Sequence, residues 1–114
     1  MTLKDKVYDY VSRQDRRRSI FIPEFDETIY FTPVNVLEME KIMTLSGGGA
    51  SSKDFHLWTI IEKAEDSEGK KIFSIEDKPI LEKMDWAIIS RISNEIQRIE
   101  PYAETKKNSP ITPS

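Results

Sequence analysis

Apolar residues recur every three or four positions in four segments of the chain, which is the spacing of a helix with one face on a core. These segments cover residues 3–13, 35–45, 53–65 and 86–99. The last segment has the most regular stripe, formed by Trp86, Ile89, Ile92, Ile96 and Ile99. We call this stripe the apolar seam, and we expect it to run along the longest helix.

Two short β-rich segments lie near the N-terminus. The first, Ile20–Pro23, is ended by its proline, and the second, Thr28–Thr32, alternates apolar and polar residues with the period of a half-buried strand. The few residues between them suit a hairpin loop. Because a two-stranded hairpin is marginally stable alone, it must pack on helices or gain strands from another subunit.

A charged connector follows the first helical segment. That segment begins after Thr2, a suitable N-cap, and its apolar residues Leu3, Val7, Tyr10 and Val11 form one stripe. Arg16–Arg18 have two interpretations: a patch for anions or nucleic acid, or a solvated linker that repels itself and stays extended. The net negative charge of the chain favours the linker.

Three glycines follow the second helical segment. Asn35 is a suitable N-cap for that segment, and its predicted apolar stripe is Val36, Leu37, Met39, Ile42 and Met43. Glycine runs also cradle phosphates, but Gly47–Gly49 are not followed by a Lys–Ser/Thr pair at the Walker spacing. We therefore expect a flexible linker between two helices, with Ser51 or Ser52 capping the next one.

Polar residues at 66–71 predict a turn around Gly69, and its acidic residues only faintly echo a calcium loop. A short helix should follow, with Ser74 and Asp77 as a capping box and Pro79 limiting its length. Asp85 is the expected cap of the last helix.

No catalytic constellation is visible in the sequence. His56, the only histidine, has no nucleophile or carboxylate near it that would make it catalytic, so we expect it to be structural or exposed. The carboxylates are scattered over predicted solvated faces, where we expect Arg91 to pair with Glu95. The prediction is a protein that is not an enzyme and that has no metal and no cofactor.

Composition narrows the class further. The chain has 114 residues, enough for one domain, no Cys, and a net charge of −3. Without Cys it has no disulfides, thiolate zinc sites or thiol catalysis, and the acidic balance disfavours a general nucleic-acid binder. No apolar run is long enough for a membrane span and no signal peptide is visible, so we expect a soluble intracellular protein without a membrane partner.

The predicted fold class is α+β and mainly helical, with an N-terminal β-hairpin packed with four to five helices. We expect an amphipathic helix and charged connector at 1–18, one globular α+β domain at 19–100, and a disordered tail at 101–114. The tail is rich in Pro and polar residues, so its deletion should leave the thermal midpoint nearly unchanged.

Two features predict self-association. The hairpin presents an exposed strand edge, and the apolar seam serves equally well as core or as a subunit interface. The candidate partner-binding residues are Trp86, Ile89, Ile92, Ile96, Ile99, Ile20, Ile22, Ile29 and Phe31.

The order of these elements resembles the tail assembly chaperones of long-tailed, siphovirus-type bacteriophages. The resemblance rests on the strand pair in "IFIPEFDETIYFTP" and on the pattern "DSEGKKIFSIEDKPILEKMDWAIISRISNEI", and it covers residues 19–99. It is one of pattern and spacing, without an invariant motif. The linker at Gly47–Gly49 and the Ile-rich last helix depart from the family's usual pattern.

The resemblance implies a non-enzymatic assembly factor in the host cell cytoplasm that is absent from the mature virion. Such proteins bind the tape measure protein and help the tail tube protein polymerise around it, and a longer form made by translational frameshift recruits the tube protein. A slip at Lys106–Lys107, before Asn108, is compatible with the residues. The alternatives are a head–tail completion protein, a small regulatory interaction module, or a nucleic-acid-binding regulator that uses the Arg run.

Overall fold

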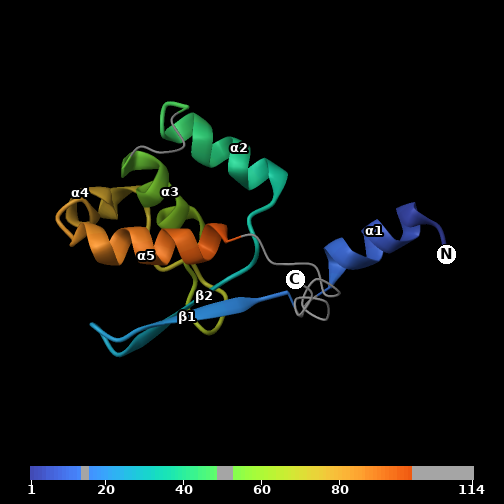
Figure 1. Cartoon of the computed structure of the whole chain (residues 1–114), viewed down its shortest axis with the longest axis horizontal. Coiled ribbons are helices and arrows are strands. Elements are labelled where there is room, and N and C mark those ends of the chain that lie inside the picture. The colour runs from blue at the N-terminus through green and yellow to red at the C-terminus, as the bar shows by residue number, and fades with distance from the viewer. Residues whose placement is uncertain (14–15, 49–52, 99–114) are drawn as a thin grey trace, which may run out of the picture.

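A computed structural model of the chain describes residues 1–13, 16–48 and 53–98 (Figure 1). The elements are α1 (Leu3–Ser12), β1 (Arg18–Ile22), β2 (Glu27–Phe31), α2 (Val36–Leu45), α3 (Lys53–Lys63), a 3₁₀ turn (Ile75–Asp77), α4 (Lys78–Leu81) and α5 (Trp86–Gln97). The fold is therefore α+β and mainly helical, as predicted. The predicted tail at 101–114 and the caps at Ser51 and Ser52 lie outside the described residues.

Strands β1 and β2 form the predicted antiparallel hairpin. Ile20 faces Ile29 in the register, and Ile22, Ile29 and Phe31 point to the side that is buried. The turn between the strands contains Asp26 with a φ of 54°, a left-handed conformation that Asp tolerates better than most residues. The alternation read from Thr28–Thr32 is confirmed, since Ile29 and Phe31 are buried whereas Thr28 and Tyr30 are only partly covered.

Helix α3 is the centre of the helical body. It packs against α2 and α5, which lie on different sides of it (Figure 1). Five of its large apolar side chains are buried, namely Phe55, Leu57, Trp58, Ile60 and Ile61. This burial follows from contact with two helices, because each neighbour covers a different face of α3.

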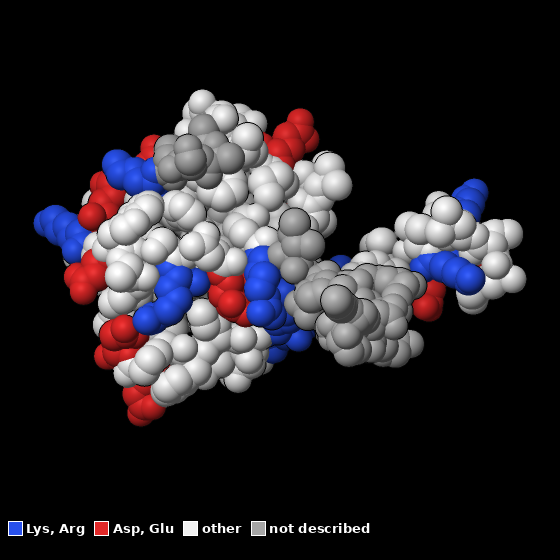
Figure 2. Space-filling view, in the orientation of Figure 1, with Lys and Arg blue, Asp and Glu red and all other residues white. Residues whose placement is uncertain are grey.

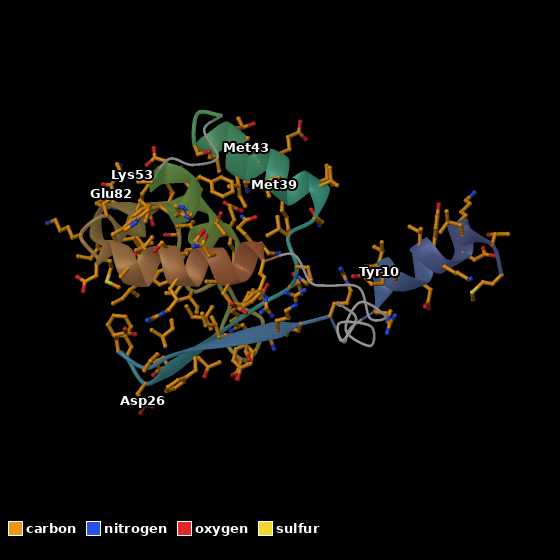
Figure 3. All side chains as sticks on the ribbon, in the orientation of Figure 1. Tyr10, Asp26, Met39, Met43, Lys53 and Glu82 are labelled. Carbon is orange, nitrogen blue, oxygen red and sulfur yellow. The ribbon has the colours of Figure 1, made fainter. Side chains whose placement is uncertain are left out.

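Helix α2 corrects one prediction. Asn35 caps it as expected and forms a capping box with Glu38, but Val36 and Leu37 are 84% and 74% exposed. Ile42 alone is buried, with Met39 and Met43 half-covered by the core (Figure 3). The predicted apolar stripe is therefore wrong for Val36 and Leu37, because α3 covers only one side of α2.

Helix α5 carries the apolar seam into the core. Ile89, Ile92 and Ile96 are buried, as is Ile88 beside them. Asp85 occupies the predicted N-cap position but makes no side-chain capping bond, and the helix ends at Gln97, two residues earlier than expected. Within the described part of the chain, no helix is both long and apolar enough to cross a membrane.

Candidate interaction surface

A groove of about 870 Å³ separates the hairpin from the helical body. Apolar side chains from both layers form its floor: Ile22, Ile29, Ile60, Phe73, Leu81, Met84, Ile89 and Ile92. Phe25 and Ile72 line it as well and are 53% and 41% exposed, so its apolar lining continues out to solvent. We call this feature the hairpin groove. It has the shape and lining that suit the apolar face of an amphipathic segment.

The charged lining of the hairpin groove is mostly acidic. Asp26 comes from the tip of the hairpin (Figure 3), Glu27 begins β2, and Asp66 lies in the turn after α3. Lys71 is the one basic residue of the lining. Beside it, the backbone of Tyr30 exchanges two hydrogen bonds of 2.8 Å with Glu65, away from β1. Thr28 lies two residues before Tyr30 on the same strand, so its backbone N–H and C=O groups also point away from β1. Thr28 is part of the groove lining.

Arg17 fastens the acidic turn to the hairpin. Its guanidinium donates to the carbonyls of Asp66 and Ser67, at 2.9 Å for Ser67, and lies 3.7 Å from a carboxylate oxygen of Glu65. It also lies 4.5 Å from the centre of the Tyr30 ring. The interpretation of the Arg run as a solvated linker is therefore wrong for Arg17, because contacts with residues about 50 positions away hold it in place.

The turn at 66–70 is a local hydrogen-bonded structure. The Asp66 carboxylate accepts from the backbone N–H groups of Glu68 and Lys70 at 2.8 and 3.0 Å. These bonds, that of Lys70 foremost, hold the pKa of Asp66 below its usual value. Among the described residues, no group of acidic or histidine side chains is arranged to hold a metal ion.

Helix α1 stands away from the rest of the molecule (Figure 1). None of its residues is buried, and its apolar stripe of Leu3, Val7, Tyr10 and Val11 is open to solvent. The N-terminus of the helix is nonetheless capped, because Thr2 and Asp5 form a capping box. At its other end, Arg16 lies 5.0 Å from the Tyr10 ring centre. We call residues 1–13 the α1 arm.

Charge is distributed unevenly between the N-terminal segment and the rest of the chain. Residues 1–18 contain six Lys and Arg and three Asp, whereas the remaining residues contain eleven Lys and Arg and seventeen Asp and Glu. Over the face of the body seen in Figure 2, basic and acidic side chains lie close together, and the arm projects away from them. The N-terminal segment is thus basic, while the rest of the chain is acidic.

His56 is part of the contact between α3 and α5. Its Nδ1 lies 2.7 Å from Oγ of Ser93, and its ring meets the Trp86 ring edge-on at 5.2 Å. Burial lowers the pKa of His56, so the neutral ring is favoured. Ser93 is completely buried and cannot meet a substrate, which makes this pair structural, as predicted for His56.

The predicted partner-binding residues fall into three groups. Six of them lie in the core, namely Ile89, Ile92, Ile96, Ile22, Ile29 and Phe31. Four of these six, Ile22, Ile29, Ile89 and Ile92, also line the hairpin groove, and partner binding through the six stays a prediction. Trp86 is 55% exposed and Ile20 is half-buried, so partner binding through these two stays a prediction. Ile99 lies outside the described residues.

The sequence patterns did not reveal the hairpin groove or the isolation of the α1 arm. A groove arises from how far two layers stand apart, which periodicity does not report. The exposed pair Phe25 and Ile72 was the available signal, because both are large apolar residues in predicted turns or loops.

Comparison with protein-family models and with curated protein sequences gives no match. Among solved structures, the chain is similar to the tail assembly chaperone of bacteriophage HK97. The TM-score is 0.57, the sequence identity is 8%, and the alignment covers 88% of this chain and 98% of that chain. The likeness is therefore one of fold, spread over nearly the whole of the HK97 protein: this chain has a fold like that of a phage tail assembly chaperone.

Proposed function

We propose that this protein is a non-enzymatic tail assembly chaperone of a long-tailed bacteriophage. The observation that carries the proposal is the fold likeness to the HK97 chaperone, which extends over 98% of that chain. The element order seen in the sequence, a strand pair followed by helices and an acidic turn, supports the same assignment. In this role the protein binds the tape measure protein and promotes assembly of the tail tube around it.

The hairpin groove is the surface that we assign to the client. The tape measure protein is expected to be long and helical, so in isolation it exposes apolar stripes that aggregate. A groove with an apolar floor and an acidic lining covers such a stripe while keeping the complex soluble. Binding of this kind needs no catalytic group.

The test is co-expression with the tape measure protein of the same phage. Alone, the tape measure protein should sediment as aggregate, and with this protein it should stay in the soluble fraction and co-purify. A tape measure protein that aggregates equally in both cases would contradict the proposed function.

A pair of matched variants locates the client. Phe25→Ser with Ile72→Ser removes the exposed apolar residues of the groove, and Val36→Ser with Ile80→Ser removes exposed apolar residues elsewhere. The groove variant should lose the client and the control should keep it, with circular dichroism showing both folded. If both keep the client, the groove is not its binding site.

The remaining parts of the proposal concern location and partners. The protein should act in the host cytoplasm and be missing from purified virions, whereas a head–tail completion protein would be found in the particles. A longer frameshifted form should be visible as a minor larger band that pulls down the tail tube protein. The nucleotide sequence at Lys106–Lys107 tests the slip site directly, because the slip needs an uninterrupted run of A bases.

A further inference from the structure

Within the described part of the chain, the α1 arm is an amphipathic helix with no buried residue. It has ten residues, a length at which an isolated helix is marginal in water. Its stripe of Leu3, Val7, Tyr10 and Val11 nevertheless faces solvent along the whole helix, although a capping box defines its start. A short amphipathic helix is stabilised mainly by packing its apolar face on another surface. The described residues of the same copy do not provide this surface for the α1 arm.

We propose that the α1 arm of one copy docks its apolar stripe into the hairpin groove of a second copy. The groove offers an apolar floor between the two layers, with Phe25 and Ile72 partly exposed beside it. An amphipathic helix laid in an apolar groove is a recurrent mode of recognition, in which residues spaced i, i+4 and i+7 act as anchors. Leu3, Val7 and Tyr10 have this spacing.

Charge complementarity supports this pairing. Lys4 and Lys6 flank the stripe, and Asp26, Glu27 and Asp66 line the groove with Lys71 as the only cation. Lys4 and Lys6 of one copy thus complement the acidic lining of the groove of another copy. Such pairs on the rim speed and orient association more than they tighten it.

The path of the chain favours a second copy over the arm's own groove. Arg17 is fixed against Tyr30 and Glu65, and the chain leaves this point away from the body. Arg13 and Arg16 both lie against the Tyr10 ring, at 6.0 and 5.0 Å, so both flank the C-terminal end of the helix. Figure 3 shows Tyr10 beyond one end of the hairpin and Asp26 at the other end.

An arm-to-groove contact joins two different surfaces. Each copy can give its arm to one neighbour and receive an arm from another, so the contact generates rings or open chains instead of closed pairs. This contact uses the same groove as the client of the proposed function, but it forms between two copies without a client. An arm in the groove would compete with the client for the same floor.

Sedimentation of two complementary variants tests the contact. The arm variant carries Leu3→Ser, Val7→Ser and Val11→Ser, and the groove variant carries Phe25→Ser and Ile72→Ser. At tens of micromolar the wild-type protein should form species larger than a dimer. Each variant alone should be monomeric, because its self-association should be at least tenfold weaker than that of the wild-type protein. A one-to-one mixture has one intact arm and one intact groove, so it should form a dimer that grows no further.

Controls and contrary outcomes separate this contact from others. Tyr8→Ser with Asp9→Ser changes the arm outside its stripe and should associate like the wild-type protein. A monomeric wild-type protein, an arm variant that still associates, or a mixture that stays monomeric would each overturn the proposal. The arm variant should still hold the tape measure protein in solution, so loss of self-association and loss of chaperone function are measured independently.

Discussion

Arg91 of α5 donates to both carboxylate oxygens of Glu24, a residue 67 positions earlier in the turn of the hairpin. The Nη1–Oε2 distance is 3.1 Å, and the bond holds the pKa of Glu24 below its usual value. The sequence predicted a pair between Arg91 and Glu95 instead, and that prediction is wrong, because Glu95 lies 3.5 Å from Arg98. The pair joins the hairpin tip to the helical body.

A double-mutant cycle with Glu24→Gln and Arg91→Met should therefore show favourable coupling at pH 7 in low salt. Both side chains are open to solvent, so the coupling should shrink toward zero in about 1 M salt. Since the pKa of Glu24 is lowered on folding, the coupling should also be lost as the pH falls below about 4.5 and the carboxylate is protonated. Coupling that persists in high salt would show that the pair acts through packing instead of charge.

Lys63 is a buried cation that forms an ion pair with the carboxylate of Glu38. Its Nζ lies 2.7 Å from Glu38 and 3.0 Å from the Thr32 hydroxyl. Glu38→Gln leaves the ammonium buried without its counter-charge and should lower the free energy of unfolding by about 1–3 kcal/mol, less than for a fully buried pair. Lys63→Met removes the charge and keeps the volume, so chemical denaturation should show a smaller loss. A larger loss for Lys63→Met would mean that the pair itself is a net source of stability.

The apolar seam is tested by comparing a buried with an exposed member. Ile92→Ala should lower the free energy of unfolding by about 2–5 kcal/mol, because Ile92 is buried between α5 and its neighbours. Trp86→Ala should cost less than about 1 kcal/mol, since this side chain is 55% exposed. Thermal and urea denaturation measure both. Equal, small losses would mean that the seam is not part of the monomer's core.

His56 should make stability fall on mild acidification. Burial lowers its pKa in the folded state, so the unfolded chain takes up a proton first as the pH drops below about 6.5. The folded state then loses stability until the pH passes below the folded-state pKa, where the effect levels off. Because the chain has one histidine, its ring resonances report the folded pKa directly by NMR. A His56→Gln variant should lose this part of the pH dependence, and an unchanged profile would assign it to other groups.

Local periodicity predicted most of the fold correctly. The hairpin, α1, α2, α3 and α5 all follow from patterns spanning a few turns. The N-caps at Thr2 and Asn35 and the capping box at Ser74 follow from residues at most three positions apart. Such signals are local in the chain, so they do not depend on how the elements are arranged.

Features that depend on tertiary arrangement were not predictable in the same way. The hydrogen-bond and ion-pair partners of Arg17, Lys63 and Arg91 all lie at least 25 positions away, and no local pattern selects them. The apolar seam has the same spacing whether it faces a core or a second subunit, so the spacing alone does not predict which of the two buries it. Val36 and Leu37 are exposed because α3 does not cover the first turn of α2. The sequence of α2 alone does not show how far α3 extends along it.

The anchoring of Arg17 gives the chain a built-in measure of length. Its bonds to the turn at 66–67 make it a fixed point of each subunit, and α1 beyond it is about 15 Å long. Each residue between them adds at most about 3.6 Å, so the reach of the arm has an upper bound set by covalent geometry. In any array joined through the arm, that bound and the distance from the groove to Arg17 in the receiving copy together limit the repeat distance. Inserting residues between Arg13 and Arg17 would raise this limit without altering either contact surface.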